Sequence, residues 1–336
     1  MKLLIVGNPG VEHVGAHFLN AAGQMGIKAH CFDSAKAFDD NVWKRRFNWW
    51  LRGRRPGLLQ ESGEEMAASL YLARPNAFLT TGIAPVSEFA LKQAGQLGIP
   101  RLNFLTDDPW NRAHRAPWFL RALRLYDHVF SPRRANLDDL RRHGCKEVTY
   151  LPFAYAPEIH FPDEGAVPLL DHDVVFIGGA DLDRMLPVLA LIDAGIRVAL
   201  YGGYWDRDSR TQPFARGFVD PAGLRRVIGG SKVVLGLVRR ANRDGHSMRT
   251  YEVPAMRGCL LTEDTAEHRE ILGDTVYYFR DHKELVENAR GLLADDALRA
   301  RLSQAAHARI TGGGNTYRDR LEAMLPTDAA RPGPQY

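Results

Sequence analysis

A chain of 336 residues is long enough for about two domains of ordinary size. Its 45% hydrophobic and 25% charged residues exclude an intrinsically disordered protein. The net charge of +4 would suit a nucleic-acid partner, but six of the cations lie within residues 41–60, where no acid occurs. Removing these six from +4 leaves −2 for the remainder, so we expect no nucleic-acid partner.

Cysteine usage and apolar runs narrow the class further. The three cysteines, Cys31, Cys145 and Cys259, contain no CxxC pair, which argues against a disulfide framework and a cysteine-rich zinc site. The first apolar run is too short for a signal peptide, and no run approaches the ~20 residues that span a bilayer. We therefore expect a cytoplasmic protein with no metal site.

The first half alternates short apolar runs with amphipathic stretches of helical length, which predicts βαβ units and a parallel sheet. The predicted strands are 2–6, 28–32, 77–80, 101–105, 128–131 and 147–151, and the predicted helices are 14–25, 87–97 and 135–143. Residues 1–155 are thus expected to form a Rossmann-like domain.

Four prolines within residues 152–168 interrupt this pattern, because proline lacks a backbone donor and fixes φ. We interpret 156–170 as a hinge. The alternation restarts with predicted strands 173–177, 197–201, 232–237, 259–262 and 276–279 and helices 183–193, 221–228, 248–257, 283–293 and 298–310. A second Rossmann-like domain, 171–326, and a disordered tail, 327–336, complete an α/β fold of two doubly wound domains facing across a cleft.

Glycine loops follow several predicted strands. Gly7, Gly10 and Gly15 are spaced GxxGxxxxG, which is neither a dinucleotide fingerprint nor a Walker A loop, so NAD and P-loop chemistry are disfavoured. That loop either makes a tight turn or lines a ligand cleft. In the second half, strands end at Gly178-Gly179 and at Gly202-Gly203.

Arg184 follows the first of these glycine pairs and is able to meet a phosphate, which favours the second domain as the nucleotide site. The segment 239–263 carries further candidates. Ser247 is a suitable N-cap for a helix that starts near Met248, and a helix N-terminus attracts anions. Arg249 in the first turn opposes the helix dipole, which costs stability and makes most sense if an anion binds there. Glu252, one turn in, is able to accept from ribose hydroxyls. The alternative is that Ser247 only caps and that Arg249 and Glu252 form a surface pair.

The same segment resembles the donor-site motif of GT-B glycosyltransferases, especially spore-maturation-type proteins with a glycosyltransferase family 1-like C-terminal domain. Seven residues separate Asp244 from Glu252, as in the family's Glu-x7-Glu spacing, although the first acid here is Asp. Residues 252–260, EVPAMRGCL, are similar to the family's Glu-Ala-x-Ala-x-Gly-x-Pro-Val, with Cys259 in place of proline. The resemblance extends over about residues 173–317 and is only architectural before them.

The resemblance implies a GT-B fold and a transferase of the hexosyltransferase type, which uses a nucleotide sugar, UDP-sugar by preference, as co-substrate without a cofactor or an essential metal. It implies that Glu252 holds the ribose and Asp244 the donor sugar. The diphosphate contacts would come from His246, Ser247, Met248 and Arg249, and the nucleobase would lie near Gly202, Gly203 and a strand edge at Phe218 and Val219. A sugar-nucleotide epimerase and a non-catalytic nucleotide-sugar-binding or assembly protein are the alternatives.

For the catalytic base we consider loops that follow first-domain strands. His13 and Asp107 are candidates, beside His17 and Asp108. The histidines would otherwise be exposed or cap a helix, and the Asp pair would make a turn before Pro109. The acceptor stays open between a glycan, a protein and a small molecule, and the donor sugar and the stereochemical course stay open with it.

The basic segment 41–60 also contains aromatic residues at helical spacing. Through residues 44–55 it could bind anionic lipid, stack a sugar or base, or contact another subunit. Alternatively, its aromatic residues pack inside the domain beneath a solvated basic face.

Overall fold

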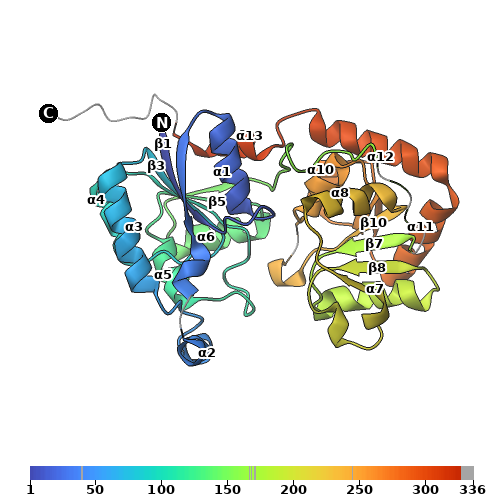
Figure 1. Ribbon diagram of the computed structural model, residues 1–336, viewed down its shortest axis with the longest axis horizontal. Helices are drawn as coiled ribbons and strands as arrows, with labels where there is room; N and C mark the ends of the chain where they lie inside the picture. Colours follow the sequence, from blue (N-terminus) through green and yellow to red (C-terminus); the bar gives the residue numbers. More distant parts are fainter. Residues whose placement is uncertain (39–40, 166, 168, 170–171, 244, 327–336) are drawn as a thin grey trace. The chain divides into compact units, whose positions relative to one another are not determined.

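The computed structural model describes residues 1–38, 41–165, 167, 169, 172–243 and 245–326, and the chain divides into two compact units (Figure 1). The first unit contains Met1–Pro152 and the chain from Tyr317 onward, and the second contains Phe153–Thr316. None of the described helices combines the length and the apolar character needed to cross a bilayer.

The first unit is built on a parallel sheet with the order β2-β1-β3-β4-β5-β6. Its strands are β1 (Lys2–Gly7), β2 (Lys28–Asp33), β3 (Ala77–Thr81), β4 (Arg101–Phe104), β5 (His128–Ser131) and β6 (Glu147–Tyr150). In register, Leu4 of β1 lies between His30 of β2 and Phe78 of β3. Leu4 and Phe78 belong to the buried apolar core, which explains why the strands read as apolar runs.

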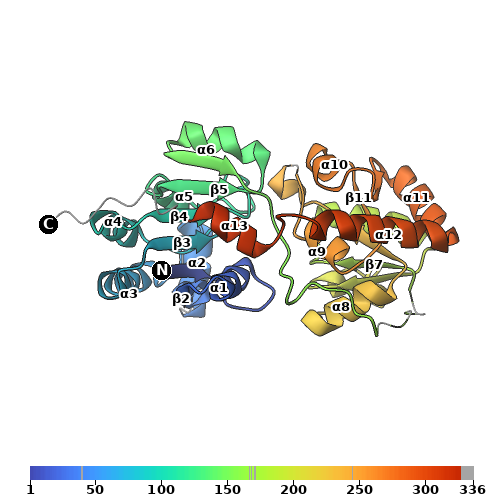
Figure 2. The same cartoon turned by 90° about the horizontal axis from the view of Figure 1, so that it is seen from above.

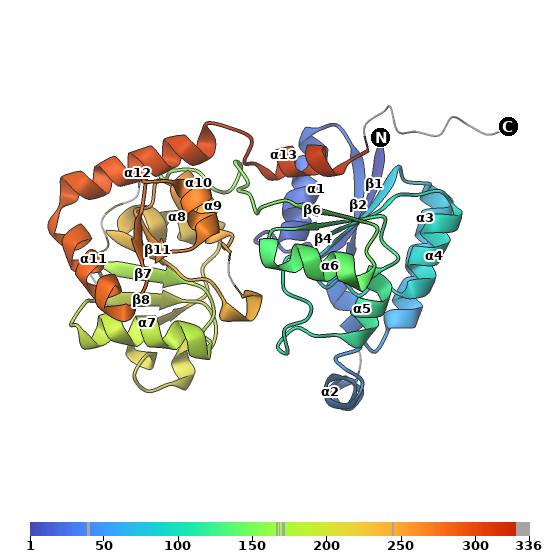
Figure 3. The same ribbon diagram turned by 180° about the vertical axis from the view of Figure 1, so that it is seen from behind.

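The described residues of the first unit form seven α-helices. They are α1 (Val14–Gln24), α2 (Val42–Leu51), α3 (Leu59–Ala73), α4 (Glu88–Gln96), α5 (Pro117–Leu123), α6 (Leu137–His143) and α13 (Tyr317–Met324). Helix α1 packs against α13, while α4 packs against α3 and α5. Helix α2 stands apart from the others of its unit (Figure 3).

Helix α13 returns to the first unit, although the sequence assigned its residues to the second domain. Tyr317 is buried, stacks on His17 with ring centroids 4.7 Å apart, and meets Phe18 edge-on. The Nε of Arg320 donates to the Pro152 carbonyl at 2.9 Å. At the other boundary, the second unit begins at Phe153, so it includes residues 153–155, which were expected in the first domain, and the expected hinge 156–170. Both differences arise from tertiary packing, which leaves no local sequence pattern.

The second unit has a parallel sheet with the order β12-β11-β10-β7-β8-β9. Its strands are β7 (Val174–Ile177), β8 (Val198–Tyr201), β9 (Ala215–Gly217), β10 (Val233–Gly236), β11 (Leu260–Glu263) and β12 (Tyr277–Phe279). Strand order reverses between β7 and β10, which creates the switch point where open α/β sheets bind ligands beyond the strands' carboxyl ends.

The helices of the second unit are α7 (Leu182–Asp193), α8 (Pro221–Gly230), α9 (Arg249–Ala255), α10 (Ala266–Leu272), α11 (His282–Ala294) and α12 (Asp296–Thr311). Helix α12 packs beside α9, α10 and α11 (Figure 2). Asp side chains cap several of them: Asp181 accepts from the Arg184 N–H at the start of α7, and Asp281 does the same for α11.

The predicted α/β architecture of two doubly wound, Rossmann-like domains is confirmed, and the predicted strands agree with the observed ones to within one or two residues. The sequence missed α3, α5, α10, α13 and the edge strand β9. The predicted disordered tail, 327–336, lies outside the described residues.

Candidate functional site

Two interlocked glycine turns lie at the carboxyl ends of β7 and β8. The Gly178 N–H donates to Tyr201 O at 2.8 Å, and the Ala180 N–H donates to Gly203 O at 2.9 Å. Gly202 has a φ of +122°, and a Cβ added there would lie 2.5 Å from Gly178 O. Any side chain at this position would therefore force the two turns apart.

Two aromatic side chains support these turns. Trp205 is fully buried, donates from Nε1 to Gly178 O at 2.8 Å, and packs edge-on against Phe176. Phe218 is 83% exposed, yet a Cβ on Gly203 would come within 3.3 Å of its ring. Phe218 thus presents an open face beside the glycine turn, where a flat ring is able to stack.

The expectation that Phe218 and Val219 form a strand edge is wrong. Strand β9 ends at Gly217, whose φ is +73° and whose carbonyl accepts from the Gly202 N–H at 2.7 Å. The left-handed conformation ends the strand, and the two residues follow it as a connection to α8. They remain close to the glycine turns despite this change.

Arg184, in the first turn of α7, points back to the same edge of the sheet. Its Nη1 donates to Gly179 O at 3.0 Å, and its guanidinium lies over the Phe176 ring. Burial, followed by the charge of Arg239, lowers the pKa of the Arg184 guanidinium to about 10. Arg184 nevertheless stays charged at neutral pH.

Asp181 is shared by two arginines. The Nε atoms of Arg184 and Arg239 lie 3.7 Å and 3.4 Å from Asp181 Oδ2, but neither Nε–H makes a hydrogen bond within the described part of the chain. Two buried N–H donors on cationic side chains are therefore unsatisfied at the switch point. An anion placed there would satisfy them.

Arg249 and Glu252 open helix α9. Arg249 hydrogen bonds to Glu252 Oε2 through Nη1, and its Nε donates to Ile177 O, the last residue of β7, at 3.4 Å. Glu252 is 1% exposed, so the alternative of an ordinary surface pair is wrong. His160 Nε2 lies 3.7 Å from Glu252 Oε1, and its Nδ1 accepts from the Ala156 N–H at 3.0 Å.

The start of α9 differs from the prediction by one residue. The N-cap position is Met248, with no side-chain capping bond, so Ser247 is not the cap. Instead, the Ser247 N–H donates to Thr250 Oγ1 at 3.2 Å. The helix has seven residues, and Ser247 and Met248 precede it at the carboxyl-end edge of the sheet.

His246 does not have a side chain that is free to hold a diphosphate. The ring is fully buried, its Nε2 accepts from the Phe153 N–H at 3.2 Å, and its Nδ1 lies 2.6 Å from Glu267 Oε2. With one nitrogen accepting and the other donating, the ring is neutral and both nitrogens are used. The His246 side chain therefore does not make the implied contact with a diphosphate. It has a structural role instead, because its two hydrogen bonds hold the loop before α9 in place.

A second buried histidine holds the same loop, and the sequence did not single it out. His268 Nε2 lies 3.0 Å from Thr250 Oγ1, and Nδ1 donates to Glu263 O at 2.7 Å. Burial lowers the pKa of His268 to about 4, against the opposing hydrogen bond to Glu263 O. Asp244 lies outside the described residues.

Residues 184–326 match the family model described as "Glycosyl transferase-like". The match covers less than half of the chain, and it shows that this part is similar in sequence to glycosyltransferases. No curated protein is similar enough in sequence to be a relative.

Solved structures of low identity share the GT-B fold over nearly the whole chain. An α,α-trehalose 6-phosphate synthase from Burkholderia multivorans superposes with a TM-score of 0.65 at 15% identity, covering 100% of this chain and 99% of that one. A trehalose-6-phosphate protein from E. coli, bound with UDP-2-fluoro glucose, superposes with a TM-score of 0.62 at 14% identity, covering 96% of this chain and 98% of that one. A putative UDP-N-acetylglucosamine 2-epimerase from Listeria monocytogenes superposes with a TM-score of 0.58 at 13% identity, covering 92% of this chain and 94% of that one.

Two adjoining hollows, each of about 250 Å³, lie at the carboxyl ends of β10, β11 and β12. They share Val238, Arg240, Glu263, Phe279 and Arg280. Glu263 Oε2 accepts from the Val238 N–H at 2.5 Å, and burial raises the pKa of this carboxyl. The hollows add polar side chains next to the switch point.

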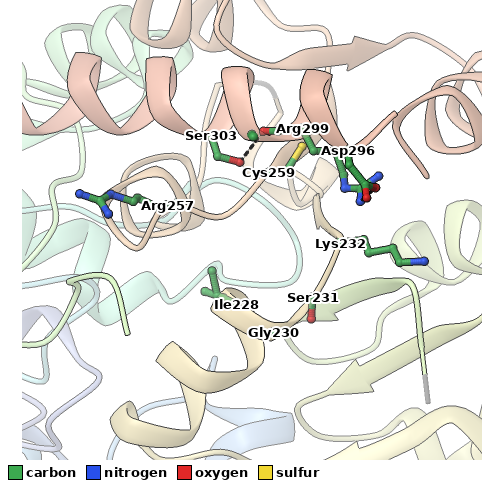
Figure 4. Close-up of a pocket in the computed structure, with 11 residues that line it drawn as sticks. Ile228, Gly230, Ser231, Lys232, Arg257, Cys259, Asp296, Arg299 and Ser303 are labelled. Atoms are coloured by element: carbon green, nitrogen blue, oxygen red, sulfur yellow. Dashed lines mark hydrogen bonds and ion pairs between the residues drawn. The ribbon is translucent and has the colours of Figure 1, made fainter. Parts of the chain in front are cut away.

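A third cavity, of about 430 Å³, lies at the amino ends of β10 and β11, away from the glycine turns (Figure 4). Its three lining cations are paired: Lys232 with Asp173 at 2.9 Å, Arg257 with Glu164 at 3.7 Å, and Arg299 with Asp296. Cys259 in its wall is buried, which raises the pKa of the thiol to about 11. With its cations neutralised and its cysteine protonated, this cavity has none of the features of the switch point.

The first-unit candidates follow strands, as expected. His13 is exposed and precedes α1 without a side-chain capping bond. Asp107 accepts from Thr106 Oγ1 at 2.9 Å, whereas Asp108 is buried and accepts from the Trp110 N–H, which makes it the turn-forming residue. A catalytic role for His13 or Asp107 stays a prediction.

Proposed function

We propose that the protein transfers a sugar, of hexose type, from a nucleoside-diphosphate sugar to an acceptor hydroxyl. The observation that carries the proposal is the convergence of three arginines, all within the matched residues 184–326, on the end of β7 and the turn after it: Arg184 contacts Gly179, Arg239 contacts Asp181 and Arg249 contacts Ile177. Two of their N–H donors lack acceptors among the described residues, and a diphosphate supplies acceptors of the required charge.

UDP is the favoured nucleotide. The E. coli structure of the same fold is bound with UDP-2-fluoro glucose, which supports a uridine nucleotide here. In the proposal, the base stacks near Phe218, and the ribose hydroxyls donate to Glu252 once Arg249 turns from that carboxylate toward the diphosphate.

In the transfer, the bond between the anomeric carbon and the diphosphate oxygen breaks, and the leaving nucleoside diphosphate keeps the electron pair. The acceptor oxygen forms the new bond and loses its proton to a base, for which His13 and Asp107 are candidates. Fixed arginines stabilise the developing charge on the leaving group, so the proposal needs no metal ion. We expect turnover to persist in the presence of a chelator.

Calorimetric titration with UDP, GDP and ADP tests the donor site. We expect the unsubstituted protein to bind UDP. Arg184→Gln should weaken that affinity by about 10- to 100-fold, because the variant loses one charge-assisted hydrogen bond to the diphosphate. The same is expected of Glu252→Gln. Arg301→Gln, at an exposed position on α12, is the matched control and should bind as the unsubstituted protein does. Absence of binding to all three nucleotides would contradict the proposal.

An epimerase is the second candidate, because the Listeria structure shares the fold. Incubation with UDP-sugars separates the two activities. A transferase slowly hydrolyses its donor to UDP and free sugar when water replaces the acceptor, whereas an epimerase returns a UDP-sugar of inverted configuration. Binding without either product would identify a non-catalytic nucleotide-sugar-binding protein.

A further inference from the structure

Helix α2 presents its apolar side chains to solvent. Trp43, Phe47, Trp50 and Leu51 are 76%, 50%, 77% and 73% exposed. Their spacing, i, i+4, i+7 and i+8, places them on one face of the helix. The one buried residue of the helix is a polar one, Asn48. The alternative in which these aromatic residues pack inside the domain is therefore wrong.

The helix is anchored to its unit beyond its last turn and not through its apolar face. The Asn41 side chain accepts from the Trp43 N–H at 2.9 Å and caps the first turn. Beyond the last turn, Arg54 donates to Ala113 O, and Trp118 Nε1 donates to Arg54 O at 3.2 Å. A ten-residue helix has little stability of its own in water, so an unburied apolar face on such an anchored helix points to a surface that covers it.

The charge of the segment identifies the kind of surface. Its cations are Lys44, Arg45, Arg46, Arg52, Arg54 and Arg55, and none of them forms an ion pair within the described part of the chain. Two of them lie over aromatic rings of the helix: Arg52 over Phe47 at 5.5 Å and Arg54 over Trp49 at 4.9 Å. Exposed Arg112 and Arg115 flank Ala113, to which Arg54 is bonded, and extend the positive surface.

We propose that α2 and the residues up to Arg55 dock the protein on the surface of an anionic lipid bilayer. Trp and Phe side chains suit the interface between headgroups and acyl chains, and Leu51 lies on the same face. Lys and Arg side chains place their charges among lipid phosphates while their stems cover apolar surface. The proposal concerns where the protein sits and does not depend on the proposed transfer reaction.

Other occupants fit these side chains less well. A second copy would bring two clusters of six cations together, with no acid in either segment to offset their repulsion. A nucleic acid would stack on the aromatic rings but would leave Val42 and Leu51 exposed. A bilayer accepts both the cations and the aliphatic side chains.

Flotation of the full chain with vesicles tests the proposal. Vesicles of phosphatidylcholine alone are compared with vesicles containing one-third phosphatidylglycerol, at low and high salt. We expect retention only on the anionic vesicles and its loss at high salt. Trp43→Ala/Trp50→Ala should weaken retention by at least about tenfold, and so should Lys44→Gln/Arg45→Gln/Arg46→Gln.

Matched controls come from other exposed positions. Tyr71→Ala/Leu72→Ala removes exposed apolar surface from α3, and Arg226→Gln/Lys283→Gln/Arg301→Gln removes three exposed cations from the second unit. Both should be retained as well as the unsubstituted protein, and all variants should keep its melting temperature. Retention that is equal in the α2 variants and the controls, or absent on anionic vesicles, would overturn the proposal. The proposal would also be overturned if the protein formed a dimer that the α2 variants lose. Binding of RNA that the α2 variants lose, without binding to vesicles, would overturn it as well.

Discussion

His268 makes the stability of the second unit depend on pH. The side chain is 1% exposed and bridges Thr250 Oγ1 and Glu263 O. Burial lowers its pKa from 6.5 to about 4, because the charged imidazolium is poorly solvated there. In the folded protein, His268 therefore takes up its proton only at a pH far below that at which an unfolded histidine does.

The sign follows from proton binding in the two states. Between pH 6.5 and about 4 the unfolded chain binds the proton and the folded chain does not, so the free energy of unfolding falls as the pH falls. The full effect of this shift is ~3.4 kcal/mol, at 1.36 kcal/mol for each pH unit. At pH 5, ~2 kcal/mol of it is already lost.

Urea unfolding at pH 7.5 and pH 5 measures the effect, with His268→Gln as the comparison. The glutamine removes the titrating group, so the variant should be less stable at pH 7.5 but should lose ~2 kcal/mol less than the unsubstituted protein on acidification. His160 and His128, whose pKa values burial also lowers, titrate in both proteins and cancel. An equal loss of stability in both proteins would refute the assignment to His268.

Four further substitutions test the packing around the site by urea unfolding. Gly202→Ala should cost ~2–4 kcal/mol because its Cβ meets backbone at a positive φ, whereas Gly203→Ala, which meets only an exposed ring, should cost less than ~1 kcal/mol. Equal costs at the two positions would contradict this account. Trp205→Phe should cost ~2–3 kcal/mol through the lost hydrogen bond and the space left behind, and a neutral result would show that the turn does not need it. His246→Ala should cost ~3 kcal/mol because the Glu267 carboxylate loses a buried partner, and a cost within error would mean that the loop is held elsewhere.

Strands were predictable where both faces are buried. Strand β10, with the sequence VVLG, is buried throughout, and its apolar run marked it within two residues. Strand β9 has the sequence ARG, is largely exposed, and exists only because it pairs with β8 at the edge of the sheet. A segment defined by its neighbour carries no pattern of its own, so the sequence could not reveal it.

The site was predictable to the extent that it follows from topology. Gly178 and Gly202 come together because the carboxyl ends of parallel strands share one edge of the sheet. The role of His246 was not predictable, because its partners Glu267 and Phe153 are 21 and 93 residues away in sequence. A motif places such a residue in a loop, but only the fold decides whether its ring faces a ligand or the interior.

The site thus divides its polar residues between two tasks. Buried histidines have their nitrogens bonded to the chain and fix the loop before α9, since a buried polar network is stable only when it is complete. The arginines keep unsatisfied donors, because the Nε–H groups of Arg184 and Arg239 have no hydrogen-bond acceptor among the described residues. The two guanidinium groups also repel each other, which contributes to the lowered pKa of Arg184. Because the pKa of Arg184 is still about 10, its guanidinium keeps its proton at neutral pH, and the repulsion between the two arginines persists. In the proposed function, an incoming diphosphate relieves it, so the strain within the cationic cluster contributes to donor affinity while the histidines keep the cluster in place.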